Sequence, residues 1–197
     1  MLVQEKKINT SAGRQLSFDR ILLTGFRATG KSLVGRLLAD RLGLGFLDTD
    51  TLLERRFGCS LSDFVAEHGW DLFRHQEDLL LQELSERTGV VLATGGGAIL
   101  HSRTWQTLRR QSVSIWLQAD EQTIKSRLAT DVNSERQRPS LTGLDPCGEI
   151  STLLDERDPL YERGSDFAVC TDDRLPRELV EDVEQGLKLL TREMNNI

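Results

Sequence analysis

Residues 25–32 constrain the fold of this chain more than any other segment. They spell G-x-x-x-x-G-K-S and lie between an apolar run at 21–23 and a helix-like run at 33–42. A strand, a glycine-rich loop and the start of a helix form the setting in which this pattern folds as a P-loop. The glycines allow successive backbone N–H groups to face phosphate oxygens, and the positive end of the helix dipole adds to the same place. The segment therefore predicts a site for a nucleoside triphosphate.

The pattern also assigns roles to single residues of the loop. Lys31 is expected to reach the β- and γ-phosphates, and Ser32 to offer its hydroxyl to Mg²⁺. The other residues expected to contact the nucleotide are Gly25, Arg27, Ala28, Thr29 and Gly30. A glycine-rich turn that binds nothing is the alternative, but the flanking strand and helix favour the phosphate site.

Short apolar strands and helical patterns alternate along the rest of the chain. Strands are expected at about 20–24, 45–47, 90–93, 113–117 and 167–170, and helices at about 31–42, 50–57, 61–68, 71–87, 102–110, 120–129, 149–162 and 177–193. This order predicts an α/β fold with a parallel sheet that carries helices on both faces. In the helix at 71–87, the candidates for the buried face are Leu72, Leu79, Leu80 and Leu84.

Length and composition predict an ordinary one-domain enzyme. The 197 residues are expected to form one domain at 19–197 after a flexible polar extension at 1–18, with a mobile lid at 131–148. The net charge of −6, with scattered basic residues, gives no reason to expect a nucleic-acid partner. The three cysteines lack C-x-x-C spacing, which indicates reduced thiols in the cytoplasm. No apolar run is long enough for a membrane span, so neither a membrane partner nor a secretory leader is expected.

Polar residues follow three of the predicted strands. Asp48 and Asp50 follow the second strand, and Gly95, Gly96 and Gly97 follow the third. Ligands of parallel sheets gather at the carboxyl ends of the strands, so these residues are expected to meet the P-loop. Asp48 and Asp50 alternate on an extended segment, which places both carboxylates on one side, one to hold Mg²⁺ and the other to accept or orient an acceptor hydroxyl. The alternative is that one of them caps the helix that starts near Thr51.

Five segments together resemble the shikimate kinase family, over essentially the whole chain from residue 21 onward. They are residues 25–32, 48–50, Phe73-Arg74 with Glu77, residues 94–98, and Arg138-Pro139 followed by residues 157–161. Without the resemblance, the residues predict only a magnesium-dependent phosphotransferase with an unknown acceptor. A single arginine is most often a surface residue, so spacing alone does not select the arginines that would bind the acceptor. The resemblance implies a P-loop kinase fold with a five-stranded sheet, and ATP-dependent phosphorylation of the 3-hydroxyl of shikimate, a step toward chorismate.

The resemblance also implies roles for residues of this chain. Lys31, Asp50 and Arg138 would be catalytic, with Asp50 taking the acceptor hydroxyl and Arg138 arriving with the lid. Arg74, Arg157 and the triple glycine would bind shikimate, with the two arginines on its carboxylate. Ser32 and Asp48 would serve Mg²⁺, and Arg127 and Pro176 would enclose the adenine of ATP. We expect a monomer that acts on a small molecule.

The chain departs from the family pattern at a few positions. Ala28 stands where many relatives have glycine, which is tolerable if its φ stays negative. The lid is a few residues longer than in compact members, Ser140 replaces a common leucine, and Cys170 lies near an often acidic position. Two alternatives stay open: another small-molecule kinase of the gluconate or nucleoside type, and a nucleotide-binding regulatory module without catalysis.

Overall fold

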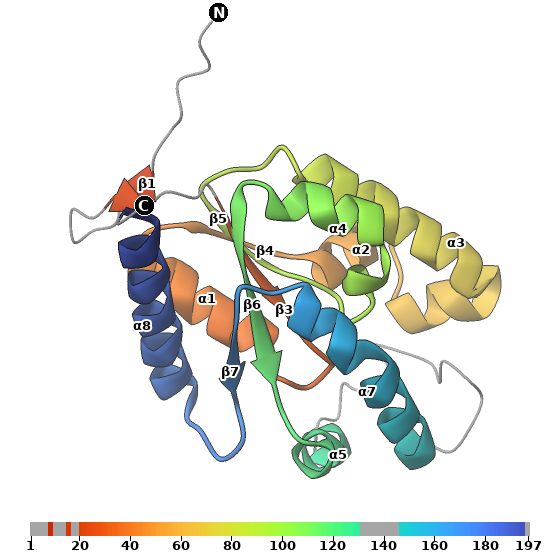
Figure 1. The fold of residues 1–197 in the computed structure, drawn as a ribbon. Coiled ribbons are helices and arrows are strands. Elements are labelled where there is room, and N and C mark those ends of the chain that lie inside the picture. Colours follow the sequence, from red (N-terminus) through yellow and green to blue (C-terminus); the bar gives the residue numbers. More distant parts are fainter. Residues whose placement is uncertain (1–7, 10–14, 17–19, 131–145, 196–197) are drawn as a thin grey trace, which may run out of the picture.

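The computed structural model of the chain describes residues 8–9, 15–16, 20–130 and 146–195. A five-stranded parallel sheet lies at its centre, in the order β4-β5-β3-β6-β7 (Figure 1). The strands are β3 (Arg20–Thr24), β4 (Gly45–Asp48), β5 (Val90–Ala93), β6 (Ser112–Gln118) and β7 (Phe167–Cys170). The predicted strands and the five-stranded parallel sheet are confirmed.

Helices cover both faces of this sheet. They are α1 (Lys31–Leu42), α2 (Thr49–Phe57), α3 (Leu61–Leu84), α4 (Ser102–Arg109), α5 (Glu121–Thr130), α7 (Pro146–Arg163), α8 (Pro176–Asn195) and a short 3-10 helix, η1 (Ala98–Leu100). Helices α1 and α8 lie on one face, and α2, α3, α4 and α7 on the other (Figure 1).

Side chains that alternate along the central strand build the two cores. In β3, Ile21 and Leu23 pack with α1 and α8, whereas Leu22 packs with α2, α3 and α4 on the opposite face. All five residues of β3 are buried, as expected for a central parallel strand covered on both sides. The rigid sheet therefore fixes the carboxyl ends of β3, β4 and β5, where the P-loop and the other predicted site residues begin.

Helix α3 corrects the predicted buried face. The prediction of two helices, at 61–68 and 71–87, agrees with a break at Gly69, which has φ 80° and ψ 166°. The face turned to the core carries Phe73, Leu80 and Leu84, whereas Leu72 and Leu79 are 41% and 37% exposed. Each exposed leucine directly precedes a buried position, so a rotation of about 100° per residue turns it away from the core. The predictions for Leu72 and Leu79 were wrong, and those for Leu80 and Leu84 were right.

Arg20, which the sequence analysis did not single out, ties two helices to the opposite end of the sheet. Its side chain is only 1% exposed, although it stands at the first position of β3. The guanidinium donates to carbonyls at the ends of α3 and α4 and to one hydroxyl: those of Leu84, Ser85, Arg87, Leu108 and Ser112. The last carbonyls of a helix have no partner within it, so this buried cation satisfies groups that packing removes from water.

Two segment boundaries also differ from the predictions. Ile8–Asn9 (β1) and Gln15–Leu16 (β2) form a short antiparallel ladder within the predicted extension. Helix α7 begins at Pro146, so the last three residues of the predicted lid are helical instead, because proline suits the first turn of a helix. The rest of the predicted lid, 131–145, lies outside the described residues, and Arg138 with it.

Candidate functional site

The P-loop joins β3 to α1 as predicted. Gly25 and Gly30 have φ values of 135° and 89°, which side-chain-bearing residues rarely adopt. A Cβ atom on Gly25 would also collide with the carbonyl oxygen of Leu117. Within the loop, Thr29 Oγ1 and Lys31 Nζ donate to the carbonyl oxygen of Phe26, over 2.9 and 2.6 Å. The loop is thus held in shape by its own residues, with Lys31 at the first position of α1.

Ala28 contradicts the expectation of a negative φ. Its φ is 63°, in the left-handed region that costs an L-residue about 1–2 kcal/mol. Its carbonyl oxygen accepts a hydrogen bond of 3.2 Å from Arg127 Nη1. The loop therefore keeps a glycine-like conformation at a position occupied by alanine.

Asp48 and Asp50 lie across a helix start and not along an extended segment. Helix α2 begins at Thr49, and Asp48 caps it by accepting the backbone N–H groups of Asp50 and Thr51 over 3.0 and 3.2 Å. The cap is thus Asp48, and the helix starts at Thr49, one or two residues before the predicted start at 50–51. The other oxygen of Asp48 accepts from Ser32 Oγ over 2.5 Å. The two residues predicted to serve Mg²⁺ are therefore in direct contact, and Asp50 lies in the first turn of α2.

The triple-glycine segment lies against the P-loop and against three helices, α2, α3 and α7. Gly95 N–H donates to Thr49 Oγ1 at 2.7 Å, and the Gly96 carbonyl accepts from the Tyr161 hydroxyl at 2.6 Å. A Cβ atom on Gly96 would lie 3.4 Å from the carbonyl oxygen of Gly25, and one on Gly97 would overlap the guanidinium of Arg74. The family resemblance implies that these glycines bind the substrate. At Gly96 and Gly97 the space is shared with the chain's own groups.

Arg74 is held in place by the buried carboxylate of Glu77. Its Nη1 donates to Glu77 Oε2 over 2.5 Å, and Glu77 is 1% exposed. The guanidinium also lies over the rings of Trp70 and Phe73, at 5.2 and 5.4 Å from their centroids. His101 Nε2 contacts the same Glu77 oxygen at 2.9 Å. Arg74 is thus fixed in direction by an ion pair and by aromatic packing.

Arg157 approaches the glycine segment from α7. It is 5% exposed, its Nη1 lies 3.5 Å from the Gly96 carbonyl oxygen, and its guanidinium lies 5.9 Å from the ring centroid of Phe26 in the P-loop. Arg74 and Arg157 therefore reach Gly97 and Gly96 from two different helices.

The predicted adenine residues lie at the other end of the P-loop. Besides its bond to Ala28, Arg127 donates to Thr171, from Nη1 to Oγ1 over 3.0 Å and from Nη2 to the carbonyl over 2.6 Å. Pro176 begins α8 a few residues further on and is half-buried. Arg127 thus connects α5, the P-loop and the segment after β7.

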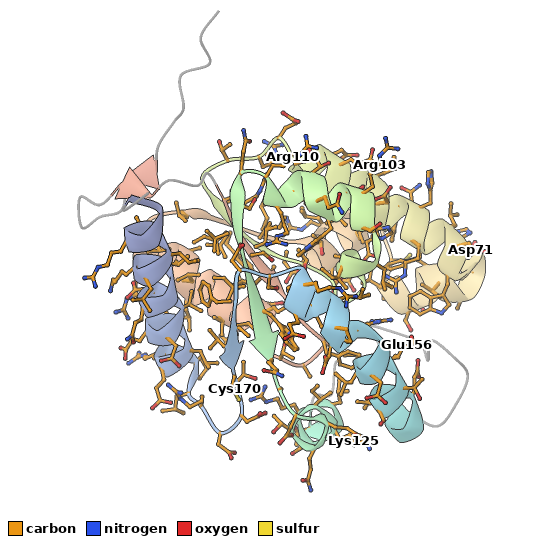
Figure 2. The ribbon with its side chains drawn as sticks, in the orientation of Figure 1. Asp71, Arg103, Arg110, Lys125, Glu156 and Cys170 are labelled. Atoms are coloured by element: carbon orange, nitrogen blue, oxygen red, sulfur yellow. The ribbon has the colours of Figure 1, made fainter. Side chains whose placement is uncertain are left out.

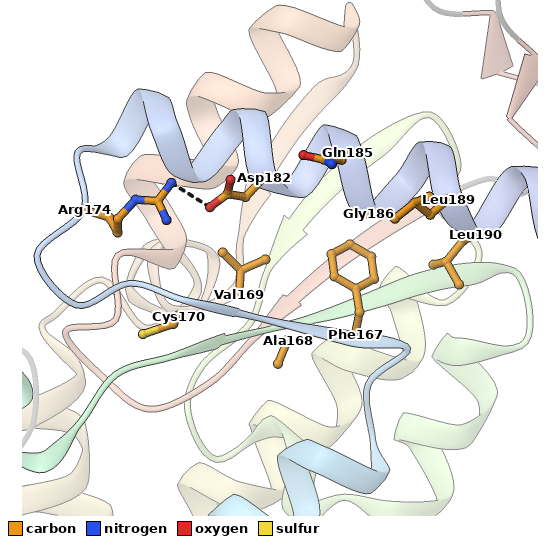
Figure 3. A pocket seen from close by; sticks show the side chains of 10 residues that line it. All are labelled: Phe167, Ala168, Val169, Cys170, Arg174, Asp182, Gln185, Gly186, Leu189 and Leu190. Carbon is orange, nitrogen blue, oxygen red and sulfur yellow. Dashed lines mark ion pairs between the residues drawn. The ribbon is translucent and has the colours of Figure 1, made fainter.

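Cys170 closes β7 beside this segment (Figure 2). The backbone N–H of Asp172 lowers the pKa of the Cys170 thiol, but the carboxylate of Asp172 and partial burial outweigh it and raise the pKa overall. A raised pKa lowers the thiolate fraction and with it the reactivity. The thiol also lines a hollow of about 470 Å³ between β7 and α8, where Arg174 pairs with Asp182 at 2.9 Å (Figure 3). None of the predicted site residues lines this hollow.

Several supporting residues escaped the sequence analysis. Glu77 and Tyr161 stood in the quoted motifs without a role, although their spacing from Arg74 and Arg157, three and four residues along a helix, places each beside its arginine. Thr49, Phe26 and His101 act through contacts between segments far apart in sequence, and no local pattern identifies them.

Comparisons of the sequence and of the fold with known proteins agree with one another. A family model described as Shikimate kinase matches residues 27–188. A shikimate kinase of Nitratidesulfovibrio vulgaris is 44% identical over 154 residues, which are 78% of this chain and 87% of that protein. The solved structure of a shikimate kinase from Acinetobacter baumannii in complex with shikimate has a TM-score of 0.78 and 33% identity, covering 86% of this chain and 92% of that one. A gluconokinase from Sinorhizobium meliloti, with a TM-score of 0.58 and 18% identity, shares the fold and covers 92% and 98% of the two chains.

Proposed function

This chain belongs to the shikimate kinase family, and we propose that it transfers the γ-phosphoryl group of ATP to the 3-hydroxyl of shikimate. The products are shikimate 3-phosphate and ADP, a step toward chorismate. One observation carries the assignment of the acceptor: two arginines from different helices, Arg74 and Arg157, reach the same triple-glycine segment, which packs against the P-loop. A fork of two parallel hydrogen bonds is the geometry in which a guanidinium binds a carboxylate. Shikimate carries such a group, and a nucleoside acceptor does not.

Each group of the site has a task in this reaction. Lys31 exchanges its contact with the Phe26 carbonyl for the β- and γ-phosphates of ATP, and the loop amides hold the remaining phosphate oxygens. Asp50, in the first turn of α2, orients the 3-hydroxyl and accepts its proton as the new bond to phosphorus forms. Arg127 and Pro176 enclose the adenine. Arg138 covers the phosphates when the proposed lid, shortened to residues 131–145, closes and excludes water.

The contact between Ser32 and Asp48 fits a magnesium ion. Mg²⁺ binds oxygen ligands, keeps several waters and needs only one or two groups from the protein besides the phosphates. A hydroxyl and a carboxylate oxygen separated by 2.5 Å are two such groups at the start of α1. When bound, the ion neutralises charge on the transferred phosphoryl group.

We also propose the setting in which the enzyme works. Within the described part of the chain, no helix combines the length and the apolar character needed to cross a membrane. Cys59 and Cys170 are free thiols, which supports a reducing compartment, and we propose the cytoplasm. We propose further that residues 19–197 act as a monomeric one-domain enzyme.

A competition assay tests the proposed acceptor. ADP release is measured with shikimate, quinate, gluconate and nucleosides, each alone and in pairs. Shikimate should give the highest kcat/KM by a wide margin and should inhibit turnover of any weaker acceptor. Preferred turnover of gluconate or a nucleoside would refute the assignment, and binding of ATP without transfer to any acceptor would favour a regulatory module.

A further inference from the structure

A single buried carboxylate contacts both an arginine and a histidine beside the proposed acid-binding site. Oε2 of Glu77 lies 2.5 Å from Arg74 Nη1 and 2.9 Å from His101 Nε2. The side chain of Glu77 is 1% exposed, that of His101 14% and that of Arg74 23%. Because the three groups share one oxygen away from bulk water, a change in the charge of one is screened little from the others.

His101 connects this carboxylate to the segment that follows the triple glycine. It ends η1 and precedes α4, its N–H donates to the Ala98 carbonyl at 3.2 Å, and its own carbonyl accepts from Trp105 N–H at 2.8 Å. Its backbone is thus fixed between two helices. Its ring contacts Glu77 of α3, so His101 links the end of the glycine segment to that helix.

The other ring nitrogen of His101 faces a second carboxylate. Nδ1 lies 3.6 Å from Asp78 Oδ1, which is beyond a hydrogen bond. Of the charged residues on adjoining elements, Arg103 is exposed on α4 (Figure 2), and α7, which carries Arg157, contacts η1. A neutral imidazole therefore donates through Nε2–H to Glu77, and a second proton would place Nδ1–H toward Asp78.

We propose that His101 is a positioning residue for Arg74 and that its protonation sets the charge of the proposed carboxylate clamp. This inference rests on the proposed function, because it concerns how the same site holds the acid group of shikimate. With His101 neutral, Glu77 balances the charge of Arg74. With His101 protonated, the same carboxylate is shared between two cations, so Arg74 presents more of its charge to the substrate.

The sign of the effect follows from this charge balance. Histidine is the side chain that ordinarily changes charge between pH 5 and 8. Protonation adds positive potential beside a group that binds an anion, so the KM for shikimate should be low at acidic pH and rise as the pH increases. His101 lies behind Glu77 and Arg74, so its charge is separated from the substrate carboxylate by roughly 8 Å; at a dielectric constant of about 40 this changes the affinity on the order of fivefold. The KM for ATP should lack this component.

The test compares steady-state kinetics from pH 6 to 8.5 in the full-length enzyme. Wild type, His101→Gln and His75→Asn are assayed with shikimate and ATP varied separately. Glutamine keeps a donor toward Glu77 but does not titrate. His75 is an exposed histidine one residue after Arg74, so its variant controls for the loss of a histidine on the same surface. We expect the KM for shikimate to rise about fivefold in wild type and in His75→Asn, and to stay within about twofold in His101→Gln.

A second variant makes the test independent of the first. His101→Asn also lacks a titratable ring, so the KM for shikimate should again stay within about twofold from pH 6 to 8.5. If thermal melting shows that His101→Gln folds poorly, this second variant still tests whether His101 sets the pH dependence of the KM for shikimate. Equal KM profiles in wild type and both variants would overturn the inference while leaving the proposed function intact. A wild-type enzyme that does not phosphorylate shikimate at any pH would overturn both.

Discussion

Replacing Arg157 by lysine should weaken shikimate binding more than any conservative change outside the proposed site. Arg157 is 5% exposed and already held between the Phe26 ring and the Gly96 carbonyl. Because the side chain is ordered before a ligand arrives, little of its binding energy is lost to ordering. Lysine keeps the charge but lacks the planar fork, so one of two parallel bonds to the substrate carboxylate disappears.

The size of the effect follows from that lost bond. A hydrogen bond to a charged group contributes about 1.5–3 kcal/mol, and each 1.4 kcal/mol corresponds to about a tenfold change in affinity. Arg157→Lys should therefore raise the KM for shikimate about 10- to 100-fold. Arg157→Gln removes the charge as well and should exceed that range. The KM for ATP should change little, because the P-loop backbone is kept.

Initial rates of ADP release at saturating ATP measure this effect. Arg103→Lys, on the exposed face of α4, is the matched control and should behave as wild type. Thermal melting shows whether a variant is folded, since Arg157 also packs against the P-loop. A folded Arg157→Lys enzyme with an unchanged KM for shikimate would refute the clamp.

Three further predictions address catalysis and stability. Asp50→Asn should lower kcat by about 10²–10⁴-fold in the same rate assay, because an amide cannot accept the proton of the acceptor hydroxyl, while the KM for ATP stays nearly unchanged. Near-normal turnover would exclude Asp50 as the base. Ala28→Gly should stabilise the protein by about 0.5–1 kcal/mol in urea unfolding, because relief of the left-handed conformation (φ 63°) outweighs the entropy of glycine, whereas the helical Ala39→Gly should destabilise it. Burial, reinforced by the Asp155 carboxylate, raises the pKa of Asp158, so the folded state keeps this proton to higher pH than the unfolded state and loses stability as the pH rises through the raised value. Asp158→Asn should therefore stabilise the protein at pH 7 but not at pH 3, and an equal change at both values would contradict this assignment.

Local sequence was sufficient wherever a structure depends on neighbours along the chain. The P-loop, the helix at 31–42 and the five strands follow from short patterns, because backbone geometry and apolar spacing act over a few residues. The prediction of where α2 starts was wrong, although it too depended on local sequence. Asp48 caps the helix, and an aspartate that caps a helix has the same extended backbone as one at the end of a strand, so the sequence alone does not distinguish the two.

Partners that meet only in the folded chain could not be predicted from spacing. The buried sides of α3 depend on the break at Gly69 and on which neighbours it meets, so Leu72 and Leu79 were misassigned. The left-handed conformation of Ala28 likewise comes from the loop as a whole.

The sequence by itself determined an α/β fold with a P-loop and, through its motifs, the family, and it pointed to the residues of the proposed clamp. Only the tertiary structure decided that His101 shares the carboxylate of Glu77 and that Arg20 binds the ends of two helices. The physical reason is that a hydrogen bond or ion pair acts over a few ångströms in space, whereas the residues that form it here can be separated by tens of positions along the chain.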